Sequence, residues 1–125
     1  MRNPGQILTI HTDGKGKRPP RVGSAFGWID PNTGEQLVKR IDGLTYNQAA
    51  YRAFRSALRN APVGSVIRIC CSSRVLSYQF HGFWEATDET LASLLYDVHS
   101  AIQERHLHVT ALRVPRKQNL AEELL

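Results

Sequence analysis

The feature that most constrains the fold is a short apolar run between two segments of helical periodicity. Residues 65–71 are β-branched and mostly apolar, which suits a strand buried on both faces. Such a strand lies in the centre of a sheet, and a helix that leads into it or away from it makes its neighbours parallel. The run therefore predicts an α/β sheet covered by helices.

Three strands precede the first helix. Residues 6–13 alternate between two faces, which is the period of a strand, and we expect this strand to end at Asp13. Residues 14–23 carry four basic side chains among prolines and glycines, so we expect a mobile, positively charged flap. Residues 24–29 and 35–41 flank a turn that contains Pro and Gly, and we predict that they pair as a hairpin.

Start signals and apolar spacing predict the first two helices. Thr45 opens a Thr-x-x-Gln capping box in front of a helix over residues 46–60. Ser72 or Ser73 suits the N-cap of a short helix over residues 74–80. The first of these helices precedes the apolar run of residues 65–71, and the second follows it.

The C-terminal part contains the strongest helical period. After a start signal at Thr87, apolar residues recur at helical spacing from Leu91 to Ile102 and predict a long helix on the sheet. Residues 106–114 predict the last strand, and residues 119–125 the first two turns of a terminal helix. The resulting architecture is a mixed five-stranded sheet, with three antiparallel strands, then two parallel strands, and helices on both faces.

Length and composition exclude several classes of protein. A chain of 125 residues has room for one domain, which we place over residues 1–125, and 42% hydrophobic residues exclude a disordered chain. Residues 1–5 contain no apolar leader and no window could span a membrane, so we expect a cytoplasmic protein without a membrane partner. Cys70 and Cys71 are adjacent in a strand and point to opposite faces, so we expect both to be reduced.

Five short motifs occur in a fixed order between these elements. They are Asp13-Gly14, Thr45-Tyr-Asn-Gln-Ala-Ala-Tyr51-Arg-Ala-Phe54, Cys71-Ser-Ser-Arg-Val-Leu76, Gly82-Phe-Trp84 and Val114-Pro-Arg-Lys-Gln-Asn119. Together they resemble ribonuclease H of type 1, especially its short reverse-transcriptase-like relatives. The resemblance spans essentially the whole chain and implies a ribonuclease H-like fold.

The resemblance also implies a set of four carboxylates. The family cuts the RNA strand of an RNA–DNA hybrid with two divalent ions, whose charge the carboxylates neutralise. Asp13 stands at the first ligand position, whereas Ala50 and Ser72 stand at the second and third. Glu123 is the nearest candidate for the fourth position, and Glu122 is an alternative. The chain therefore resembles a degenerate member of the family, and we interpret the two losses as natural rather than engineered.

A preformed two-metal site is not expected from this set of residues. A single weak Mg²⁺ or Mn²⁺ held by Asp13 and Glu123 is an alternative, because such an ion borrows its other ligands from substrate phosphates. We expect that the protein requires no cofactor.

Positions at which the family holds its hybrid retain polar groups. The resemblance assigns this role to Gly14, Lys15, Asn47, Ser73, Arg116, Lys117 and Asn119. Tyr46 departs from the Asn of the family, and its ring either packs or stacks on a base. The net charge of +5 also favours polyanionic partners. Binding is therefore expected to persist where catalysis is impaired.

Three functional classes follow from these residues. The first is a catalytically impaired or inactive domain that binds an RNA–DNA hybrid or double-stranded RNA through backbone shape and charge. The second is an active nuclease with an altered site that uses Asp13 and Glu123. The third is a protein-interaction module or homodimer without a role in nucleic-acid binding.

Overall fold

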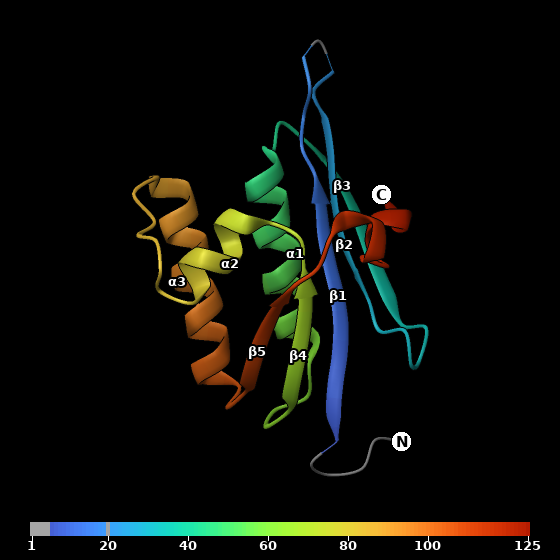
Figure 1. Ribbon diagram of the computed structural model, residues 1–125, viewed down its shortest axis with the longest axis vertical. Coiled ribbons are helices and arrows are strands. Elements are labelled where there is room, and N and C mark those ends of the chain that lie inside the picture. Colours follow the sequence, from blue (N-terminus) through green and yellow to red (C-terminus); the bar gives the residue numbers. More distant parts are fainter. Residues whose placement is uncertain (1–5, 20) are drawn as a thin grey trace.

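The computed structural model contains a five-stranded sheet with the strand order β3-β2-β1-β4-β5 (Figure 1). It describes residues 6–19 and 21–125. Residues 1–5, in which we expect no apolar leader, and residue 20 of the predicted flap lie outside the described residues. The strands are β1 Ile7–Lys15, β2 Gly23–Ile29, β3 Gln36–Asp42, β4 Val66–Cys71 and β5 His108–Arg113.

The direction of the strands confirms the mixed sheet. β1, β2 and β3 pair antiparallel, whereas β4 lies parallel to β1 and β5 lies parallel to β4. The Asp30 side chain shapes the β2–β3 turn by accepting the backbone N–H groups of Asn32 and Thr33. The turn therefore closes as its Pro and Gly residues predicted.

Three α-helices cover one face of the sheet: α1 Tyr46–Asn60, α2 Arg74–Phe80 and α3 Glu89–Glu104 (Figure 1). Both halves of the predicted capping box at Thr45 are present, and Ser73 rather than Ser72 caps α2. α1 packs directly on the sheet and α3 packs on α1, so α1 is the central helix of this layer. No helix in residues 6–19 and 21–125 is long and apolar enough to cross a membrane.

The core lies between α1 and the central strands. Ile67 and Ile69 of β4 are buried against Phe54 and Leu58 of α1, all at 1% exposure or less. Burying such side chains contributes about 1.5–3 kcal/mol each, which anchors the helix on the sheet. The two cysteines are buried and unbridged, as predicted.

Gly14 lets β1 approach α1 closely. A Cβ atom at this position would lie 2.5 Å from the Ala50 backbone nitrogen and 2.6 Å from the Ala49 Cβ atom. Only a residue without a side chain fits such an approach. Gly14 thereby places Asp13 beside the first turn of α1.

The predicted end of the first strand was wrong. β1 continues through Asp13, because Gly14 pairs with Phe26 and Lys15 pairs with Ala25. The predicted flap is correspondingly shorter, and its tip is tied by a bridge between Arg18 and Arg21. Sequence alone did not show that the opposing strand is long enough to extend the pairing.

The C-terminal elements also differ from the prediction. Residues 119–125 do not begin an α-helix and contain the 3₁₀ turn η2 Glu122–Leu124 instead. A first 3₁₀ turn, η1 Arg116–Gln118, precedes them. These turns lie on the opposite side of the sheet from the α-helices (Figure 1). Helices were expected on both faces, but within the described residues the second face carries these short 3₁₀ turns and no α-helix. β5 starts at His108 rather than at 106, because His106 adopts a φ of 52° as the chain leaves α3.

Candidate functional site

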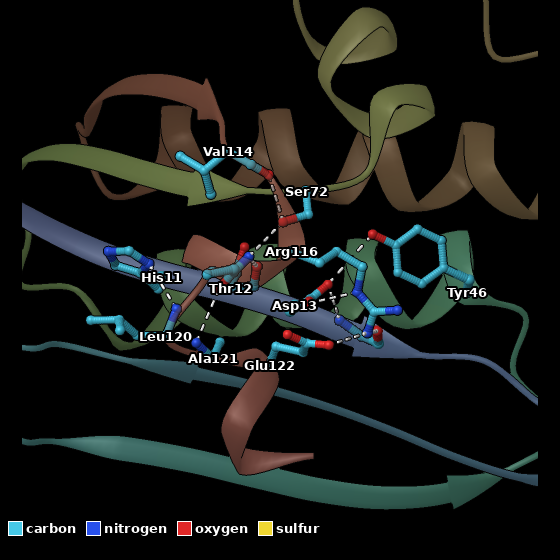
Figure 2. A network of polar contacts seen from close by, with 12 residues as sticks. His11, Thr12, Asp13, Tyr46, Ser72, Val114, Arg116, Leu120, Ala121 and Glu122 are labelled. Carbon is cyan, nitrogen blue, oxygen red and sulfur yellow. Dashed lines mark hydrogen bonds and ion pairs between the residues drawn. The ribbon is translucent and has the colours of Figure 1, made fainter.

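Asp13 is the centre of a polar network at the junction of β1, α1 and the C-terminal turns (Figure 2). Its side chain is fully buried, and Oδ1 accepts the Gly14 backbone N–H at 2.8 Å and the Tyr46 hydroxyl at 3.5 Å. Oδ2 lies 3.3 Å from Nε of Arg116. Both carboxylate oxygens are therefore engaged by groups of the chain itself.

Arg116 is held from three sides. Nη2 donates to the Gly14 carbonyl at 3.3 Å, while Nε donates to Asp13. The guanidinium also lies over the Tyr46 ring, 5.2 Å from its centroid, which adds a cation–π attraction. Glu122 lies 4.0 Å from Nη2 on the more exposed side.

Burial dominates the electrostatics of this network. It raises the pKa of Asp13 above the ordinary value, although the Gly14 amide and the charge of Arg116 oppose the shift. Burial, together with the neighbouring Asp13 charge, raises the pKa of Tyr46 to about 12. Tyr46 is therefore a phenol at neutral pH and acts as a hydrogen-bond donor.

Ser72 lies next to this network and joins β4 to the C-terminal segment (Figure 2). Its hydroxyl donates to the Val114 carbonyl at 2.8 Å and accepts from Asn119 Nδ2 at 3.0 Å. Asn119 Nδ2 also donates to the Thr12 carbonyl at 2.9 Å. Ser72 and the buried Asn119 thus tie the C-terminal segment to the two central strands.

His11 makes a further hydrogen bond to the C-terminal segment, just after the turn η1. Its Nδ1 accepts the Leu120 backbone N–H at 3.1 Å, and burial lowers the pKa of the imidazole. A neutral ring with an unprotonated Nδ1 fits this bond. The turn that carries Arg116 is therefore held by a bond to Val114 before it and by bonds to Asn119 and Leu120 after it.

A cleft of about 740 Å³ opens beside Arg116. It is lined by five basic residues and one acidic residue among others: Lys15, Lys17, Arg18, Arg21, Arg116 and Glu122. Such an excess of positive charge raises the local concentration of anionic ligands. The cleft is therefore an anion-attracting surface next to the buried Asp13.

The predicted binding residues divide into two groups. Lys15 and Arg116 line the cleft, and Lys117 is exposed but does not line it. Gly14, Ser73 and Asn119 are buried. Their hydrogen-bonding groups serve the fold, since Ser73 caps α2.

Asn47 is oriented by the serine that caps α2. Ser73 Oγ donates to Asn47 Oδ1 at 2.8 Å, so the amide nitrogen of Asn47 remains as the donor of this side chain. Asn47 itself is half-buried at the start of α1, one residue after Tyr46. The pair therefore presents a fixed donor at the N-terminal end of the helix.

The predicted metal ligands are not brought together as a set. Glu122 lines the cleft, whereas Glu123 is exposed and is not among the lining residues. Ala50 is buried and offers no oxygen, and Ser72 already uses its hydroxyl proton. No group of three His, Cys, Asp or Glu side chains suited to a metal ion occurs in the described part of the chain. These residues do not fit a two-metal centre.

Sequence reasoning did not find the contact of the Tyr46 hydroxyl with Asp13, or the entry of Glu122 into the cleft. Among the basic side chains of residues 14–23 it assigned a binding role to Lys15 and treated Lys17, Arg18 and Arg21 only as part of a flap. The clustering of Lys and Arg in that segment was the available signal, but the strand extension that directs them at the cleft depends on pairing with β2.

The sheet order, the helices on one face and the place of Asp13 define a ribonuclease H fold, as the sequence resemblance implied. No protein-family model matches the chain. No curated protein matches it either.

Several solved structures of ribonuclease H proteins are similar to this fold. The N-terminal ribonuclease H domain of a Mycobacterium tuberculosis protein matches with a TM-score of 0.80 and 20% identity, over 94% of this chain and 89% of that chain. Ribonuclease H1 from the archaeon Halobacterium salinarum matches with a TM-score of 0.79 and 22% identity, over 96% and 94%. LC11-RNase H1, solved with an RNA/DNA hybrid, matches with a TM-score of 0.78 and 23% identity, over 94% and 92%. At these identities the similarity shows the fold.

Proposed function

We propose that this domain binds a nucleic-acid duplex, either an RNA–DNA hybrid or double-stranded RNA, and does not cleave it. The observation that carries the proposal is a strongly basic cleft lined by Arg116, whose guanidinium is already paired with the buried carboxylate of Asp13. Positive charge in a groove attracts phosphates regardless of sequence. The solved hybrid complex of LC11-RNase H1 supports this type of partner for the fold.

The donors around the cleft suit recognition of a backbone rather than of bases. Lys15, Lys17 and Arg18 line the cleft and provide charge there, and Asn47, which does not line the cleft, provides a neutral donor in the first turn of α1. Duplexes with an A-like shape are recognised mostly through phosphates and 2′-hydroxyl groups across the minor groove. We therefore expect a preference for duplexes that contain RNA over double-stranded DNA.

The absence of cleavage is proposed from the carboxylate count. Hydrolysis by two metal ions needs several carboxylates that face one point, and Ala50 and Ser72 stand at the second and third ligand positions of the resemblance instead. An altered nuclease that uses Asp13 with Glu122 or Glu123 is the competing hypothesis. The third hypothesis is a protein-interaction module without a role in nucleic-acid binding.

One assay separates the three hypotheses. Labelled hybrid, double-stranded RNA and double-stranded DNA are titrated with the protein at two salt concentrations, and parallel samples with Mg²⁺ or Mn²⁺ are examined for products. Release of three to five counterions would weaken binding by about 40- to 500-fold between about 50 and 200 mM salt. We expect salt-sensitive binding without products. Products that disappear in Asp13→Asn would establish the altered nuclease, and no binding at either salt concentration would leave the interaction module.

A further inference from the structure

We infer that the guanidinium of Arg116 serves as the cation beside Asp13 and binds a backbone phosphate without any divalent metal. This inference rests on the proposed function, because it names the group that contacts the duplex at the centre of the cleft. It adds that nucleic-acid binding at this site is independent of metal.

The guanidinium is positioned before any ligand arrives. Nε and Nη2 are held at 3.3 Å by Asp13 and by the Gly14 carbonyl, and the flat face of the group lies over Tyr46. An arginine fixed in this way loses little freedom when it binds an anion. Asp13 and Tyr46 are thus positioning residues, and Arg116 is the contact residue.

The remaining edge of Arg116 is open to the cleft. Its side chain is 38% exposed, and Nη1 has no hydrogen-bond partner within residues 6–19 and 21–125. Lys15, Lys17 and Arg18 line the same cleft. Arginine donors match phosphate oxygens in geometry and charge, so an anionic diester is the ligand that this edge suits.

Glu122 opposes this ligand. Its carboxylate lies 4.0 Å from Nη2, and its side chain is 41% exposed. Its exposure allows it to turn towards solvent when a phosphate enters. Its removal should therefore favour the ligand.

A divalent ion does not fit beside this arginine. Asp13 Oδ1 receives the Gly14 amide at 2.8 Å, and Oδ2 faces the Arg116 charge. A metal ion at Asp13 would face the repulsion of the guanidinium, and Asp13 is the buried carboxylate available to balance both charges, since Glu122 is 41% exposed. The negative charge of the buried Asp13 carboxylate is balanced by the positive charge of the Arg116 guanidinium.

The test compares variants that separate charge from contact. Asp13→Asn with Arg116→Gln removes one negative and one positive charge, so the net charge stays at +5 and the buried carboxylate is not left unpaired. We expect this double variant to bind hybrid about tenfold or more weakly, with a salt slope lower by about one. Arg116→Lys keeps the charge but not the planar fork, so we expect an unchanged slope and weaker binding.

The control variant is Arg59→Gln, which removes one exposed arginine at the far end of α1, about 20 Å along the helix from Tyr46. We expect it to bind within about twofold of the wild type. All titrations are run with chelator and again with Mg²⁺ at constant ionic strength, and thermal melts verify that each variant is folded. We expect that Mg²⁺ does not tighten the binding of wild-type protein.

The outcomes distinguish the two proposals. If wild-type protein binds the duplex but the double variant binds equally well, or if Mg²⁺ tightens wild-type binding, the role of Arg116 is overturned while the proposed function stands. If the folded wild type binds no duplex, the proposed function fails and this inference fails with it.

Discussion

Replacement of Gly14 by alanine tests the packing that places Asp13. The added Cβ atom would lie 2.5 Å from the Ala50 nitrogen and 2.6 Å from both the carbonyl carbon and the Cβ atom of Ala49. Two of these three atoms belong to the backbone of α1, so no rotamer change can relieve the contact. β1 and α1 must move apart by about 1 Å to restore ordinary contact distances.

The cost of this movement follows from the tight packing of the core. Overpacking of a core costs about 1–3 kcal/mol, and the rigid backbone of α1 favours the upper end of that range. The unfolding entropy of a domain of this length is about 0.26 kcal/mol/K, so a loss of about 3 kcal/mol lowers Tm by about 11 °C. We therefore expect Gly14→Ala to fold with a Tm that is about 10 °C lower.

The assay is thermal unfolding followed by circular dichroism, with Gly23→Ala as the matched control. Gly23 is also a strand glycine, but a Cβ atom there meets nothing within 4 Å. Gly23→Ala should therefore unfold within about 1 kcal/mol of the wild type, or be slightly more stable. A Gly14→Ala protein whose Tm equals that of Gly23→Ala would refute the close approach of β1 and α1.

Three further variants test the polar network. Asp13→Asn should raise Tm at neutral pH, because burial raises the pKa of Asp13 and the ionised carboxylate therefore lowers the stability of the wild type. This difference in Tm should shrink as pH falls through the raised pKa and vanish below pH 3.8, so a difference that does not change with pH would contradict the prediction. Glu122→Gln removes the one acidic residue that lines the cleft and should tighten hybrid binding about threefold at low salt but not at high salt, as measured by fluorescence anisotropy. Ser72→Ala removes the bonds to Val114 and Asn119 and should lower the free energy of unfolding by about 1 kcal/mol in urea titrations, whereas an unchanged value would show that these bonds contribute nothing.

The parts of the fold that sequence predicted are those with local causes. α1 and α2 have the predicted bounds because caps at Thr45 and Ser73 and the apolar spacing behind them act within a few residues. The extension of β1 to Lys15 depends on pairing with Ala25, and so on a strand beyond the loop. The C-terminal segment forms 3₁₀ turns because its bonds to His11 and Thr12, more than 100 residues earlier, fix its path.

The candidate site was predictable to a similar degree. Asp13 was identified from its motif and its strand, and Arg116 from the last turn. Their ion pair joins residues 103 positions apart, and the contact of Tyr46 with Asp13 spans 33 positions, so neither has a local signature. The distinction between Glu122 and Glu123 depends on one residue of register in a 3₁₀ turn, which apolar periodicity does not resolve.

The number of carboxylates at the end of a strand determines which cation can sit there. Several carboxylates that face one point repel each other, and divalent ions relieve that repulsion while they activate water. One buried carboxylate needs only one positive charge, and an arginine of the same chain supplies it without loss of translational freedom. In this protein the Gly14 amide, the Tyr46 hydroxyl and Arg116 together satisfy Asp13. The same geometry leaves one edge of Arg116 towards the cleft, and this is the edge that we propose binds a phosphate.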